Sequence, residues 1–148
     1  MAGHSSYVMK MLKEMAEKEV EIATQALANA MKVADEAQTK YKLLTEYRQE
    51  YSNNLNQSLE TGIDTQAYQN FHGFFRKLDQ AVKGQLEIME LTKQQVQVKK
   101  NHWKESQRKK LSYEVLDHRN ETKQEKIVQK KDQKLMDEFA MRAAGRHK

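Results

Sequence analysis

Apolar side chains recur every three or four positions through the first part of the chain. From Leu12 to Leu59, twelve of the fourteen positions reached in this way are apolar, and the mean step is about 3.6 residues, the repeat of a nearly straight α-helix. Neither proline nor glycine interrupts this stretch. The pattern predicts one long helix whose apolar face runs for roughly 70 Å and needs a partner of similar length. This face comprises Leu12, Met15, Glu19, Ile22, Ala26, Ala30, Val33, Ala37, Tyr41, Leu44, Arg48, Tyr51, Leu55 and Leu59.

A second apolar stripe follows and supplies that partner. Nine of its twelve positions are apolar, although glycines at 73 and 84 lie inside the predicted helix. The stripe comprises Phe75, Leu78, Val82, Leu86, Met89, Lys93, Val96, Lys100, Trp103, Gln107, Leu111 and Val115.

Turn-forming residues separate the two stripes. Gly62 suits the left-handed position just past a helix end, and Asp64 or Thr65 suits the N-cap of the next helix. A connection this short makes two long helices antiparallel neighbours. We therefore expect an all-α fold in which two long helices form an antiparallel coiled coil within a single domain, residues 1–148. The expected parts are helix one at about 6–59, beginning near Ser5 or Ser6, a turn at about 60–65, helix two at about 66–120 and a projecting C-terminal tail at about 121–148.

The tail outruns the first helix. If the turn is centred near residue 62, Val115 lies opposite about residue 9, so the chain past roughly 120 has no partner helix. That segment either projects as a lone helix or stays disordered until it is bound. Its end nevertheless carries an apolar row at Leu135, Phe139 and Ala143, flanked by Met136. We expect this narrow amphipathic helix to bind another protein.

Composition agrees with a helical hairpin. The 148 residues are 38% apolar and 32% charged, with no proline and no cysteine, which is too little apolar material for a thick core and excludes disulfides. No apolar run approaches the roughly 18 residues of a membrane span, and we expect a cytoplasmic protein. The net charge of +5 divides into −3 over residues 1–92 and +8 over residues 93–148. The C-terminal part therefore favours acidic proteins, anionic membranes or nucleic acid.

Catalytic chemistry is not expected. The sequence has no glycine-rich phosphate loop, no nucleophile elbow and no zinc-protease motif. The five histidines show no pairing three or four positions apart, and adjacent helical carboxylates such as Asp137 and Glu138 point in different directions. We predict no enzyme activity, no cofactor and no metal site.

Two further clusters are candidates for binding. Near the turn, Tyr47 and Phe74 widen the apolar band beyond what a two-helix interface needs, so the aromatic residues there are either helix interface or a partner site. A basic segment, residues 99–110, surrounds Trp103. It is either a solvated helix face or a docking site for an acidic surface. Nucleic acid is an alternative, although acids at 105, 114 and 117 interleave and no nucleic-acid-binding motif is present.

Three separated segments resemble the FliJ family of flagellar type III export proteins. They are AEKEV at 16–20, YRQEYSNNL at 47–55 followed by Gly62 and Ile63, and DQKLMDEFAMRAA at 132–144. The resemblance covers nearly the whole chain. It implies a coiled coil like the central stalk (gamma) subunit of rotary ATP synthases.

The resemblance also implies two main partners, the flagellar export ATPase hexamer and the membrane export gate FlhA, with chaperones of export substrates as possible others. It implies a place at the inner face of the cell membrane. The implied ATPase-binding residues are Gln133, Leu135, Met136, Asp137, Glu138, Phe139 and Arg142. The implied gate-binding residues are Leu44, Tyr47, Tyr51, Phe74, Leu78 and Ala81, with two polar positions of that surface replaced at Lys40 and Gln85. The alternatives are the equivalent stalk of a virulence type III secretion system and, in another class, a basic coiled-coil protein that binds nucleic acid.

Overall fold

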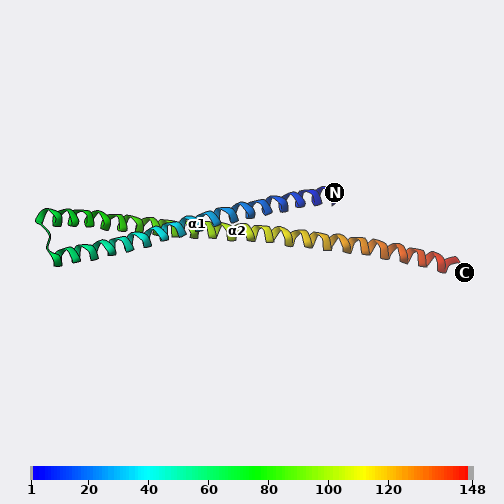
Figure 1. The fold of residues 1–148 in the computed structure, drawn as a ribbon. Helices are drawn as coiled ribbons and strands as arrows, with labels where there is room; N and C mark the ends of the chain where they lie inside the picture. Colours follow the sequence, from blue (N-terminus) through cyan, green and yellow to red (C-terminus); the bar gives the residue numbers. More distant parts are fainter. Residues whose placement is uncertain (1, 147–148) are drawn as a thin grey trace. The chain divides into compact units, whose positions relative to one another are not determined.

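The computed structural model describes the backbone of residues 2–146 and the side chains of residues 6–145. Helix α1 spans Ala2–Thr61 and helix α2 spans Thr65–Arg146 (Figure 1). The prediction of two long helices paired as an antiparallel coiled coil is confirmed. Helix α1 begins at Ala2, earlier than the expected start near Ser5 or Ser6. The last residues of the predicted tail, 147–148, lie outside the described range.

The turn has the chemistry that its residues predict. Gly62 has φ +88°, in the left-handed region that glycine adopts without strain. The Asp64 side chain accepts a hydrogen bond of 2.7 Å from the backbone N–H of Ala67, which makes Asp64 the N-cap of α2. The two helices therefore reverse direction over only three residues.

The chain forms two compact units, each described by itself. Residues 21–104, the hairpin unit, contain the turn and the adjoining parts of both helices. Residues 1–20 and 105–148, the terminal unit, contain the first part of α1 and the last part of α2. Within the described residues, neither helix holds a segment long and apolar enough to cross a bilayer.

The interface between the helices of the hairpin unit, the seam, repeats every 3.5 residues. On α1 the less exposed positions run from Ala23 to Ser58 in ten steps over 35 residues, and on α2 from Phe75 to Trp103 in eight steps over 28 residues. A repeat of 3.5 is that of a left-handed coiled coil. The predicted repeat of 3.6 is therefore wrong, and it displaces the predicted face from the seam as the chain moves away from the turn.

Side-chain exposures show this displacement directly. On α1, Ile22 and Val33 were expected to be inside but are 68% and 52% exposed, whereas Ala23 is 1% exposed. On α2, Leu86 is 41% exposed and its neighbour Gln85 is 9% exposed. The seam is thus built largely from small and polar residues, and several larger apolar residues lie outside it.

Two polar side chains in the seam of the hairpin unit, Gln85 and Arg48, have partners across it. The Gln85 side-chain amide donates a hydrogen bond of 3.0 Å to the backbone carbonyl of Ala37. Arg48 forms an ion pair of 3.0 Å with Asp79, and its guanidinium lies over the ring of Phe75 at 5.1 Å from the centroid. Such cross-seam pairs fix the register of two helices more sharply than alanines can.

The terminal unit shows the same pairing. Ala16 and Val20 on α1 are buried, as is Ser106 on α2. Lys13 forms an ion pair of 3.0 Å with Asp117, and this hydrogen bond and the carboxylate charge raise the pKa of the Lys13 ammonium above its usual value. A second ion pair joins Lys109 to Glu19 at 3.4 Å.

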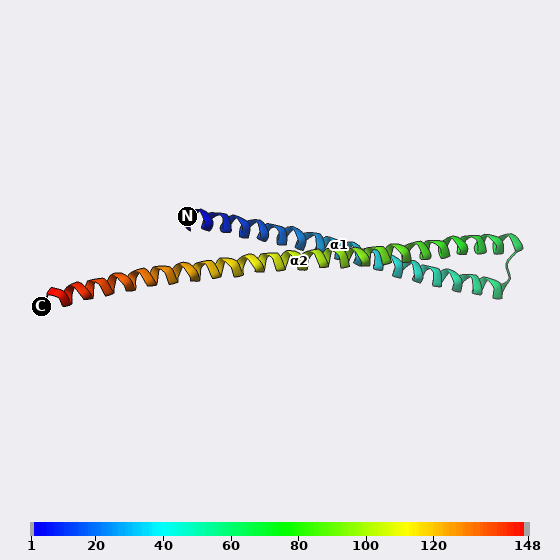
Figure 2. The ribbon, with the colours of Figure 1, turned by 180° about the vertical axis from the view of Figure 1, so that it is seen from behind.

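Helix α2 continues alone at the end of the terminal unit. Every side chain from Lys123 to Gly145 is exposed. In both ribbon views the orange-to-red part of α2 runs well past the N-terminal end of α1 (Figures 1 and 2). This segment, residues 123–145, is called the tail below.

Candidate protein-interaction surfaces

The aromatic residues near the turn form a surface on one side of the hairpin unit. The Tyr51 ring lies between two phenylalanines, with ring centroids 5.2 Å from Phe71 and 4.8 Å from Phe74. Burial, and then repulsion between the ionised forms of Tyr51 and neighbouring Tyr47, raise the pKa of the Tyr51 phenol above its ordinary value. The contacts hold Phe74 in place while 40% of it remains exposed.

The six residues assigned to this surface differ in exposure. Tyr47 is 48% exposed, Ala81 is exposed, and Leu44 and Tyr51 are half-buried. Leu78 is only 7% exposed and belongs to the seam. It can support the surface from below but presents little area to a partner. We name Leu44, Tyr47, Tyr51, Phe74 and Ala81 the aromatic surface.

Lys40 and Gln85, the two positions where polar members of this surface are replaced, differ in burial. Lys40 is exposed, so its ammonium can contact a partner at the rim of the aromatic surface. Gln85 is buried and engaged with Ala37, so it acts within the seam.

The tail places its apolar side chains in water. Leu135 is 63% exposed, Met136 69% and Phe139 76%. Gln133 donates a hydrogen bond of 3.0 Å to Asp137 one turn along, and both side chains are exposed. Leu135 and Phe139 lie four residues apart and therefore on one face of the helix. Exposed large apolar side chains in a row are the ordinary signature of a helix that binds a groove in another protein.

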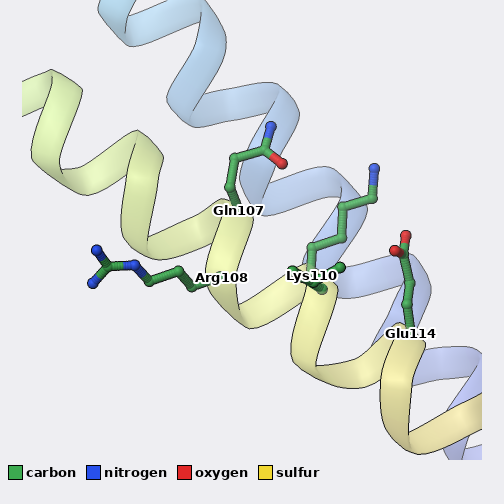
Figure 3. A pocket seen from close by; sticks show the side chains of 5 residues that line it. Gln107, Arg108, Lys110 and Glu114 are labelled. Carbon is green, nitrogen blue, oxygen red and sulfur yellow. The ribbon is translucent and has the colours of Figure 1, made fainter.

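The basic segment does not form a surface of one charge. Trp103 is half-buried and donates its indole N–H to the Thr24 hydroxyl at 3.0 Å, so its ring is not free to stack on a base. In the terminal unit, a shallow hollow of about 230 Å³ carries both signs of charge (Figure 3), and its lining residues are Gln107, Arg108, Lys110, Leu111 and Glu114. Figure 3 shows Arg108 extending away from the other labelled side chains, with Lys110 and Glu114 one turn apart. The mixture favours a solvated face over a nucleic-acid site.

The described residues also include side chains of the kinds that bind metal ions, histidines and carboxylates. No three histidine or acidic side chains among these residues come close enough to hold a metal ion. The arrangement offers two candidate protein-binding surfaces, the aromatic surface in the hairpin unit and the tail in the terminal unit.

Known proteins are similar to this sequence along nearly its whole length. The family described as flagellar FliJ protein matches residues 5–148. The chain belongs to the FliJ family. The flagellar FliJ protein of Escherichia coli (strain K12) is 34% identical over 146 residues, which cover 99% of this chain and 98% of that protein. The flagellar FliJ protein of Salmonella typhi is 32% identical over 147 residues, with the same shares of 99% and 98%.

FliJ membership confirms the resemblance drawn from the three sequence segments. It makes the chain a component of flagellar protein export, a type III secretion process, and favours the flagellar machine over the virulence alternative. The match runs from residue 5 to residue 148, so it covers parts of both units and the whole of the tail.

Proposed function

We propose that this FliJ-family chain is the stalk that joins the flagellar export ATPase to the membrane export gate FlhA. The observation that carries the proposal is the exposed tail. A helix that leaves Leu135, Met136 and Phe139 more than 60% exposed beyond the end of its partner helix has surface available only to another protein.

The tail is the proposed ATPase-binding site. Its apolar row suits the wall of a ring-shaped ATPase, and Arg142 can pair with a carboxylate there. Gln133, Asp137 and Glu138 supply the polar rim that a protein interface requires. These contacts lie in the terminal unit, away from the seam residues that hold that unit together.

The aromatic surface is the proposed gate-binding site. Tyr47 and Phe74 are large, partly exposed and held by neighbours, which are the properties of interface hot spots. Leu78 supports them from the seam, and exposed Lys40 lies at the rim.

Coupling follows from where the two sites lie. The ATPase site is in the terminal unit and the gate site in the hairpin unit, and both units share continuous helices α1 and α2. The chain therefore needs no catalytic residue of its own, because the partner hydrolyses ATP. Binding the gate would hold the protein at the inner face of the cell membrane, where chaperones of export substrates are further candidate partners.

The test mixes the chain with the cognate ATPase and measures hexamer formation by light scattering and the rate of ATP hydrolysis. We expect the wild type to promote both. Phe139→Asp should reduce hydrolysis to the rate of the ATPase alone. The matched control is Met141→Asp, because Met141 is 75% exposed in the same turn but points to another side of the helix. Full stimulation by Phe139→Asp, or equal loss with Met141→Asp, would contradict the proposed site.

A further inference from the structure

Helix α2 of the hairpin unit carries a second apolar stripe outside the seam. Ile88, Leu91 and Val98 are 48%, 60% and 55% exposed. Together with Gln95 they are spaced by three, four and three residues, the same alternation that builds the seam. A helix with two such stripes has the pattern of a helix that packs against two neighbours, and α1 occupies only one of them.

Helix α1 supplies a wall beside this stripe. Val33 is 52% exposed and Ala26 is half-buried. Between the two helices runs a groove of about 290 Å³ lined by Ala26, Asn29, Ala30, Val33, Thr92, Gln95 and Lys99. We name the groove and the stripe beside it together the outer groove.

The other edge of the hairpin unit differs in charge. The hollow there, of about 270 Å³, includes Asp35 and Lys93 among its lining residues. Those two carry opposite charges, so that edge is electrostatically balanced without a partner. Lys99 is the one charged residue that lines the outer groove.

Lys99 places a charged side chain at the edge of the seam, beside the outer groove. It occupies a seam position and is half-buried, yet among the described residues it forms no ion pair. A carboxylate brought in by whatever covers the groove would give this ammonium group an ion-pair partner. A second copy docking through the same groove would add another lysine and no carboxylate from the groove lining.

We propose that the outer groove docks an amphipathic α-helix of a second protein, one with aliphatic residues at heptad spacing and a carboxylate that reaches Lys99. Docking completes a local three-helix bundle, in which the incoming helix packs on Leu91 and Val98 from one side and on Val33 from the other. The site uses no residue of the aromatic surface or the tail, so it stands or falls independently of the proposed ATPase and gate contacts.

The probes are three fluorescein-labelled helical peptides of about 28 residues, four heptads long. The first has leucine at the two apolar positions of each heptad and glutamate at the flanking positions. The second has lysine at the flanking positions, and the third has the composition of the first in scrambled order. Fluorescence anisotropy with the full-length chain measures each affinity. We expect the acidic amphipathic peptide to bind at least about tenfold more tightly than either control.

Variants assign the binding to the groove. Leu91→Asp should lower the affinity for the acidic peptide by about tenfold or more. Leu86→Asp adds the same charge at an exposed leucine outside the outer groove and should change that affinity less than twofold. Lys99→Glu should reverse the preference between the acidic and lysine-flanked peptides. Circular dichroism confirms that each variant is folded.

Several outcomes would overturn the inference. They are equal effects of Leu91→Asp and Leu86→Asp, an unchanged peptide preference in Lys99→Glu, and binding of the scrambled peptide as tightly as the first. Sedimentation equilibrium of the wild type adds one more. If the chain forms a dimer that Leu91→Asp abolishes, a second copy covers the groove and the proposed occupant is wrong.

Discussion

Leucines on α2 allow the seam to be tested with one kind of substitution. Leu78 is 7% exposed and Leu91 is 60% exposed, and both lie inside the helix of the hairpin unit. Changing either one to alanine alters helix propensity by the same small amount, so the difference in stability between the two variants reports burial alone.

The expected magnitude follows from that burial. Leucine-to-alanine changes in protein cores cost about 2–5 kcal/mol. A two-helix seam lets water reach the space left behind, so we expect the low end, about 2 kcal/mol, for Leu78→Ala. In a protein of this size that lowers the melting temperature by about 4–8 °C. Leu91→Ala should change the free energy of unfolding by less than about 0.5 kcal/mol.

Urea unfolding followed by circular dichroism measures both variants. The two midpoints should differ while the slopes stay equal, because the same surface is exposed on unfolding. Equal losses of stability in Leu78→Ala and Leu91→Ala would refute the placement of Leu78 in the seam and of Leu91 in an outer stripe.

Three further predictions follow from the turn, the terminal unit and the tail. Gly62→Ala should lower the free energy of unfolding by about 1–2 kcal/mol, because φ at Gly62 is +88°. Gly73→Ala in the helix interior should raise it by up to about 1 kcal/mol, and an added Cβ meets nothing within 4 Å at either site. Urea unfolding checks that the two changes have opposite signs. The raised pKa of Lys13 means that its ion pair with Asp117 stabilises the fold fully below the unfolded pKa of about 10.5, and that this stabilisation is lost as pH rises through the folded pKa. The difference in melting temperature between wild type and Lys13→Gln should therefore shrink as pH rises above about 10.5. A constant difference up to about pH 12 would contradict this prediction. Deleting residues 132–148 should shift the melting temperature by less than about 2 °C, because the described side chains from 132 to 145 are all exposed, and a larger fall in differential scanning calorimetry would show hidden contacts.

The helical architecture was predictable because its signals are local. The absence of proline predicts long helices, Gly62 and Asp64 mark the turn by their own conformational chemistry, and a short turn leaves antiparallel pairing as the simplest arrangement. None of these inferences depends on which side chain faces which.

The register was not predictable from apolar periodicity, for a physical reason. The seam uses alanine and glutamine at sites such as Ala23 and Gln85, while Ile22 and Leu86 beside them are exposed. A search for large apolar residues therefore follows a mixture of seam positions and exposed positions beside them, such as Ile22 and Leu86, and the mixture has a mean step near 3.6. An amide in the seam is stabilised by a partner such as the Ala37 carbonyl, which becomes visible only when both helices are placed.

One of the candidate sites could be predicted from the sequence and another could not. The tail could be located from sequence, because the chain past about 120 outruns its partner and yet keeps Leu135 and Phe139. The outer groove could not, because it depends on the exposure of Leu91 and on Lys99 having no ion pair among the described residues. A second set of apolar residues that keeps the 3.5-residue repeat at a fixed angle from the seam is the sequence signal that would have found it.

The central claim is that one chain holds the export ATPase and the export gate at the same time through separate surfaces. The direct measurement captures the chain on an immobilised cytoplasmic domain of the gate and then records by surface plasmon resonance whether the ATPase binds on top. We expect a ternary complex with the wild type, loss of only the ATPase step with Phe139→Asp, and loss of the first step with Tyr47→Ala combined with Phe74→Ala. Displacement of the chain from the gate by the ATPase, or loss of both steps with either variant, would contradict the account.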